Sequence, residues 1–98
     1  MAYEIRIAPA AERAVGKLPA QVQAAVLDKL EELAEDPRPA TCEKVRELAS
    51  LGVYRVKVGR DYRILYQVRD EVAWVLIVKV ADRKEIYQRL ADLKRLLK

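Results

Sequence analysis

The sequence predicts an α+β fold in which a twisted, mostly antiparallel sheet carries a helical hairpin on one face. Three observations support this. The chain opens with an alternating apolar run, two helical segments follow it, and three strand-like runs then succeed one another across very short gaps. Gaps this short can only close antiparallel hairpins. An amphipathic helix expected over residues 84 to 97 completes the order β-α-α-β-β-β-α.

The chain begins with a strand and a short helix. Over residues 3 to 8, apolar side chains alternate with charged ones, which is the period of a strand with one buried face. Pro9 fits the first turn of a helix, because the N–H that proline lacks has no intrahelical partner there. Gly16 and Pro19 break the helical run, so we expect this helix to end near them.

The second helix is expected over residues 20 to 35. Its apolar residues recur at spacings of three and four, so they form one stripe that consists of Val22, Val26, Leu30 and Leu33. The helix must end before Pro37, since proline disfavours helical backbone in the residue before it. Residues 41 to 50 show no clear period, although one helical turn fits them.

Three strands are expected to form a meander over residues 53 to 58, 62 to 69 and 72 to 80. The last run is apolar on both faces, which predicts an interior strand. The opening strand then lies beside it, with the two helices as the crossover. Strict alternation places Val80 on the same face as Trp74.

The composition of the chain excludes several kinds of site. The 98 residues include one cysteine and no histidine, so an internal disulfide, a zinc or iron site and a histidine-based nucleophile are not expected. We expect no metal, no other cofactor and no membrane partner, and the lack of a signal-like opening favours a cytoplasmic protein. Proton transfers in an enzyme of this composition must use Lys, Arg, Tyr or carboxylates.

The positive charge lies in the second half of the chain. Residues 1 to 52 hold 7 Lys/Arg and 9 Asp/Glu, whereas residues 53 to 98 hold 12 and 6, within a net charge of +4. This asymmetry favours an anionic partner for the second half, most commonly nucleic acid. A basic face that only meets solvent would give the same counts.

Strand periodicity collects several of these cations on one face of the sheet. Arg55 and Lys57 alternate with apolar residues, so they point away from the core. Arg63 occupies the equivalent face of the next strand and can approach both across the hairpin. Like charges on one sheet face repel, and a phosphate backbone would neutralise them.

Further candidates for nucleic-acid binding follow the last strand. Arg83 and Lys84 add charge beside Tyr87. Tyr87 and Tyr54 offer rings on which an unpaired base can stack, as in the recognition of single-stranded RNA. The alternative is that Tyr87 packs the last helix onto the sheet and that the cations are ordinary surface charge.

Three segments in this order resemble the signature of RelE/ParE-type toxins: residues 53–59 (VYRVKVG), 61–66 (DYRILY) and 82–87 (DRKEIY). The resemblance covers nearly the whole chain and implies one RelE-like toxin domain over residues 1–98. RelE-type toxins cut messenger RNA in the ribosomal A site, and each is silenced by an antitoxin encoded beside it. The resemblance thus implies a ribosome-dependent mRNA endonuclease whose partners are the ribosome, mRNA and a RelB-like antitoxin.

The resemblance also implies roles for individual residues. Arg55 and Lys57 match the paired basic positions of the second strand, Arg63 matches a phosphate-contacting arginine, and Arg83 and Tyr87 match the arginine and tyrosine near the carboxyl end. We therefore expect catalysis from Lys57, Arg63, Arg83 and Tyr87, and RNA binding from Arg55, Tyr54 and Lys84. Lys57 is the expected base for the 2′-OH.

The sequence departs from the RelE pattern at two positions. Many RelE proteins carry lysine where Arg55 stands, and a guanidinium hardly deprotonates. Asp82 stands where relatives often carry histidine. ParE-type proteins, which inhibit DNA gyrase and cut no RNA, are the alternative, but they generally lack the full basic set together with the late tyrosine. An inactive relative or a plain RNA-binding module is the third interpretation.

Overall fold

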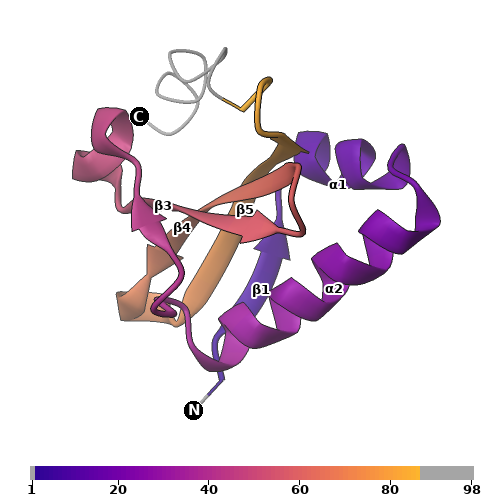
Figure 1. Ribbon diagram of the computed structural model, residues 1–98. Helices are drawn as coiled ribbons and strands as arrows, with labels where there is room; N and C mark the ends of the chain where they lie inside the picture. The colour runs from indigo at the N-terminus through magenta and orange to yellow at the C-terminus, as the bar shows by residue number, and fades with distance from the viewer. Residues whose placement is uncertain (1, 87–98) are drawn as a thin grey trace.

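The computed structural model describes residues 2 to 86. Figure 1 shows its helices and strands, which in chain order are β1 (Glu4–Ile7), α1 (Pro9–Gly16), α2 (Ala20–Glu35), β2 (Glu43–Lys44), the 3-10 helix η1 (Arg46–Leu51), β3 (Val53–Val58), β4 (Tyr62–Arg69), the 3-10 turn η2 (Asp70–Val72) and β5 (Trp74–Asp82). Residues 83 to 86 form a turn. Tyr87 and most of the helix expected over residues 84 to 97 lie outside the described residues.

One five-stranded sheet organises the molecule, in the order β1-β5-β4-β3-β2. The meander of β3, β4 and β5 is antiparallel, while β1 lies parallel to β5, so the prediction that the opening strand docks beside the last one is confirmed. The short strand β2 was not expected. It forms because Glu43 and Lys44 pair with Arg55 and Tyr54 of the neighbouring strand β3. The 3-10 helix η1 supplies the single helical turn that fits residues 41 to 50.

Helices α1 and α2 cover one face of the sheet, called here the helical face (Figure 1). The apolar stripe of α2 meets the sheet through Val26, Leu30 and Leu33, which are all buried. They pack against apolar residues of the strands, including Val56, Ile64, Tyr66, Val75 and Ile77. Three turns of apolar periodicity were therefore sufficient to predict which side of α2 is buried.

A β-bulge in β5 corrects the predicted face of Val80. The register passes from Leu65 opposite Lys79 to Tyr66 opposite Ile77, so β5 carries one extra residue at this point. Val80 therefore lies in the helical-face core with Ile77, instead of on the face of Trp74. Alternation alone does not reveal such an insertion, because it depends on the partner strand.

The opposite face of the sheet, called here the second face, has a smaller core. Leu48 of η1 and Ile86 are fully buried there against Val53, Leu65 and Val78. Among the described residues, η1 and the turn at residues 83 to 86 supply this cover, and Figure 1 shows η1 on the far side of the sheet from α2. Within residues 2 to 86, Arg55 and Arg63 on this face are half-buried and Lys57 is exposed.

We predict that Gln67→Ala lowers the free energy of unfolding by about 1–3 kcal/mol. Gln67 is 5% exposed, and its Nε2 donates to the carbonyl of Leu51 at 2.6 Å, which ties η1 to β4. The substitution leaves that carbonyl without its donor. Gln21→Ala on the exposed surface of α2 is the control, expected to change the free energy by less than about 0.5 kcal/mol in chemical denaturation. Equal effects of the two substitutions would contradict the role of Gln67.

Candidate functional site

Two of the predicted catalytic cations lie directly opposite each other on the second face. Lys57 of β3 is the cross-strand partner of Arg63 of β4. Lys57 is exposed and Arg63 is half-buried. Among residues 2 to 86, no ion pair includes either of them. Like charges in directly opposed positions destabilise a sheet, and within the described residues no acidic side chain offsets the repulsion of this pair, called here the basic pair.

The guanidinium of Arg63 is oriented by the turn that joins β3 to β4. Its Nη1 donates to the carbonyl oxygens of Arg60 at 3.1 Å and Tyr62 at 2.8 Å. The turn forms because Gly59 adopts a φ of 61°, which glycine tolerates far better than other residues. Arg63 therefore presents its remaining N–H groups from a constrained position, which suits a phosphate-binding arginine.

Arg83 and Lys84 lie at the same end of the sheet, just after β5. The backbone N–H of Arg83 donates to the carbonyl of Asp61 at 2.7 Å, so the turn after β5 is joined to the β3–β4 turn. Both side chains are exposed, and with Asp61 and Asp82 they line a hollow of about 230 Å³. The fold thus brings the basic pair, Arg83 and Lys84 to one end of the sheet.

The carboxylate of Asp82, one of the two departures from the RelE pattern, caps the turn that follows β5. Its Oδ1 accepts hydrogen bonds from the backbone N–H groups of Lys84 at 2.9 Å and Glu85 at 2.8 Å. The N–H of Ile86 then donates to the carbonyl of Asp82 at 3.1 Å, which is the first helical bond of this turn. Aspartate is favoured in such a capping position, so this residue has a structural role here.

Arg55 has a carboxylate partner that the sequence did not indicate. It lies opposite Glu43 of β2, and its Nη2 forms an ion pair with Oε2 of that residue. This contact offsets part of the charge that Arg55 brings to the second face. Glu43 was missed because β2 has only two residues and shows no strand period of its own.

Tyr54 lies on the helical face, away from the basic pair. Its ring stacks on that of Tyr66, with centroids 5.9 Å apart, and its hydroxyl accepts a hydrogen bond from Nε of Arg38 at 3.0 Å. The structure therefore does not bring Tyr54 together with Lys57 and Arg63, in contrast to the expected RNA-binding set. Alternation along β3 already placed it on this face, and its contacts belong to the packing of the core.

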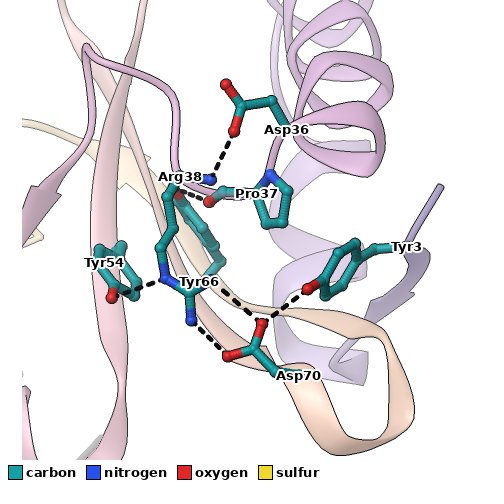
Figure 2. Close-up of polar contacts among 7 residues, drawn as sticks. All are labelled: Tyr3, Asp36, Pro37, Arg38, Tyr54, Tyr66 and Asp70. Atoms are coloured by element: carbon teal, nitrogen blue, oxygen red, sulfur yellow. Dashed lines mark hydrogen bonds and ion pairs between the residues drawn. The ribbon is translucent and has the colours of Figure 1, made fainter. Parts of the chain in front are cut away.

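Tyr54 forms part of a polar network at the end of the sheet remote from the basic pair (Figure 2). Arg38 holds Asp70 with two hydrogen bonds of 3.1 and 2.7 Å, and Asp70 also accepts one from the hydroxyl of Tyr3 at 2.7 Å. The hydroxyl of Tyr66 donates to the carbonyl of Pro37 at 2.9 Å, and burial raises the pKa of this phenol. The network fixes the loop between α2 and β2 against β4.

We expect the contribution of this network to the free energy of unfolding to depend on pH, and we expect Asp70→Asn to remove this dependence. The hydrogen bonds from Arg38 and Tyr3 lower the pKa of the Asp70 carboxyl to about 2, from an ordinary 3.8. A lowered folded-state pKa contributes stability that is fully present above the unfolded value and is lost as the pH falls through the folded one. The difference in unfolding free energy between the parent and Asp70→Asn should therefore shrink between pH 3.8 and about 2.

Denaturant titrations over this pH range measure the effect. Tyr3→Phe retains Arg38 and removes only the second donor to Asp70, so it should reduce the acid-dependent part by less than Asp70→Asn does. If the difference in unfolding free energy between the parent and Asp70→Asn stays constant with pH, the lowered pKa of Asp70 does not contribute to stability.

Comparisons with known proteins give this fold and its basic face a class, the toxins of type II toxin–antitoxin systems. Residues 5–87 match the family described as the ParE toxin of the type II toxin–antitoxin system parDE. Because this match extends over most of the chain, the chain belongs to the RelE/ParE toxin family.

Individual relatives resemble this chain over nearly its full length. Toxin RelG of Mycobacterium tuberculosis is 36% identical over 90 residues, which are 91% of this chain and 100% of that toxin. A free Escherichia coli RelE with two arginines replaced by alanine has a TM-score of 0.78 at 30% identity, covering 98% of this chain and 99% of that one. A chain of the toxin–antitoxin complex RelBE2 of M. tuberculosis has a TM-score of 0.73 at 33% identity, covering 85% and 100%. The predicted α+β fold is therefore confirmed.

Proposed function

We propose that this toxin is an mRNA endonuclease that acts on message held in the ribosomal A site. The observation that carries the proposal is the direct opposition of Lys57 and Arg63 on the second face, beside Arg83. The similarity to toxins named RelG and RelE, at 36% and 30% identity, supports the same branch of the family. Tyr87, the fourth catalytic candidate, lies outside the described residues and stays a prediction.

RNA cleavage without a metal requires from the protein a base, an acid and the stabilisation of negative charge in the transition state. The 2′-OH attacks the adjacent phosphorus while a base takes its proton, the new P–O bond forms, and the bond to the 5′-oxygen breaks. We assign the base to Lys57 and the stabilisation of the doubly charged transition state to Arg63, whose orientation is already set by two carbonyls. We assign to Arg83 or Tyr87 the proton that the departing 5′-oxygen takes up to leave as a hydroxyl, and Arg83 lies at the same end of the sheet as the basic pair.

The dependence on the ribosome follows from these residue types. Lysine and arginine hold their protons tightly at neutral pH, so neither is an efficient acid or base. The protein alone should be a poor nuclease. The ribosome would hold the RNA with the 2′-oxygen in line with the phosphorus, and such positioning contributes a large part of the lowering of a reaction barrier.

We propose an antitoxin as the controlling partner. The matched chain of RelBE2 comes from a toxin–antitoxin complex, and structures of that kind support an equivalent partner for this chain. A basic face that acts on RNA is silenced most simply by an acidic segment that folds over it. Binding of the cognate antitoxin should therefore weaken as the salt concentration rises, and an affinity that stays constant with salt would contradict charge masking.

The decisive experiment adds the purified, tag-free protein to translating ribosomes and maps message ends by primer extension. We expect cuts within the A-site codon and intact message when the same RNA is offered without ribosomes. Rapid cleavage of naked RNA would contradict the ribosome dependence. Intact message together with inhibition of DNA supercoiling by gyrase would favour the activity of ParE-type toxins instead. The matching family carries the ParE name.

Among residues 2 to 86, no helix has the length and apolar content that crossing a membrane requires.

A further inference from the structure

A second group of cations lines a cleft between α1 and the end of β5, at the end of the sheet that carries the basic pair on its second face. The cleft has a volume of about 400 Å³ and is lined by Arg13, Lys17, Lys79, Tyr62, Asp82 and Glu85, among others. Arg13 is an exposed residue of α1, Lys17 is exposed directly after this helix, and Lys79 comes from β5. A volume of this size holds a nucleotide-sized group.

The cations of this cleft have no ion-pair partner among the described residues. Within the described part of the chain, no ion pair or side-chain hydrogen bond includes Arg13, Lys17 or Lys79. Arg13 lies in the last turn of α1 and Lys17 is the C-cap residue four positions later, a spacing at which like charges repel. Favourable interaction with the carboxyl end of α1 would be a structural reason for them. There, however, the side chain of Gln23 already donates to the carbonyls of Gly16 and Leu18.

The β-bulge in β5 explains how Lys79 reaches the cleft. Without the bulge, alternation from Val75 and Ile77 would place Lys79 on the helical face, beneath α1 and inside the apolar core. The extra residue puts Val80 into that core and Lys79 opposite Leu65, on the side of the second face. The pairing of β1 with β5 ends at Ile77, so Lys79 is half-exposed at the open edge of β5 and contributes to the lining of the cleft from there. Bulges recur beside functional sites, where they redirect a side chain.

The cleft also lies close to the proposed catalytic end of the sheet. Asp82, which lines it, is followed directly by Arg83, and Ala81, also in its lining, is the cross-strand partner of Arg63. The basic pair lies on the second face and α1 on the helical face, so a polynucleotide strand that contacts both places has to pass around this end of the sheet. Tyr62 is half-exposed in the same lining and offers a ring beside the cations.

We propose that the α1–β5 cleft is a second phosphate-binding site, which takes a backbone phosphate of RNA at some distance from the bond that is cut. Arg13, Lys17 and Lys79 bind the phosphate, and Asp82 and Glu85 limit the net charge of the cleft, so the site contributes affinity without closing tightly on the strand. Asp82 is largely committed to capping the turn after β5. This inference rests on the proposed action on RNA but concerns binding, not the chemical step.

The test compares the double variant R13Q/K17Q with the charge-matched control K29Q/R69Q, which removes two cations outside the cleft. The probe is a short 2′-O-methyl oligoribonucleotide, which cannot be cut because its 2′-oxygen carries no proton. Binding is measured over a range of salt concentrations. For R13Q/K17Q we expect weaker binding and a slope of log K against log salt that is shallower by about 0.7 for each phosphate that the variant no longer neutralises. The control should keep the parental slope.

A slope for R13Q/K17Q equal to that of the control would overturn the proposal. K79Q provides an independent variant from the sheet, and it should weaken binding in the same direction. A mononucleotide that binds with an affinity sensitive to R13Q/K17Q, while the slope for the oligonucleotide is unchanged, would assign the cleft to a free nucleotide and also overturn the RNA assignment.

These readouts separate the further inference from the proposed nuclease. If the parent protein cuts no message but the cleft variants still lower the salt slope, the second phosphate site stands and the nuclease proposal fails. If the parent cuts message and the cleft variants behave like the control, the nuclease stands and the cleft has no role in RNA binding.

Discussion

Arg63→Ala is expected to lower the single-turnover rate of message cleavage on ribosomes by about 10²- to 10³-fold, which is the usual cost of removing one preorganised donor at a charged transition state. Arg63 is constrained by the carbonyls of Arg60 and Tyr62, so its guanidinium reaches the phosphate without prior reorganisation. Rapid-quench cleavage with toxin in excess over ribosomes measures this rate.

Arg69→Ala is the matched control, because Arg69 is an exposed arginine at the other end of the same strand. It should cut at nearly the parental rate. Arg63→Lys keeps one positive charge but lacks the planar fork, so its rate should lie between those of the parent and Arg63→Ala. A folded Arg63→Ala protein that cuts as fast as the parent would remove this residue from the proposed mechanism.

Lys57→Ala is expected to have an effect of similar or greater size, about 10²- to 10⁴-fold on the same rate, because general base catalysis typically contributes that much. Ribosome binding should change far less, since other cations of the face remain. Lys44→Ala, at an exposed position of the neighbouring strand β2, is the control for removal of one lysine.

Lys57→Arg distinguishes a base from a simple phosphate contact. Arginine keeps the charge opposite Arg63 but hardly gives up its proton. If Lys57 is the base, the arginine variant should be nearly as slow as Lys57→Ala. Substantial activity in Lys57→Arg would show that the position needs only charge, and the assignment of the base would have to move to another residue.

Local periodicity was enough to predict most of the regular structure and the exposed position of the basic pair. Each strand has a period of two and each helix a period close to three and a half, so the sequence indicates which side of each element is apolar. For that reason Arg55, Lys57 and Arg63 were expected on the side of the sheet away from α2, and Lys57 and Arg63 lie opposite each other there.

The antiparallel meander and the crossover of β1 to β5 followed from connection lengths alone. The gaps after β3 and β4 are too short for any other arrangement, and two consecutive helices are long enough to bring the chain back beside β5. The resemblance to RelE/ParE toxins added the family, which the comparisons confirm.

Features that depend on a distant partner were decided only by the tertiary structure. The strand β2 exists because β3 offers it an edge, and with it Glu43 becomes the partner of Arg55. Likewise, Tyr54 carries a ring that suits base stacking, but Arg38 and Tyr66 hold it on the helical face. Contacts of this kind join residues far apart in the chain, so no local pattern reports them.

The sequence by itself determined the fold class, the family and the two cations of the basic pair, because these depend on the order of elements and on alternation within single strands. The tertiary structure alone decided the β-bulge in β5, which moves Val80 into the helical-face core and places Lys79 opposite Leu65. The physical reason is that register is a property of two paired strands: one inserted residue changes the face of every later side chain.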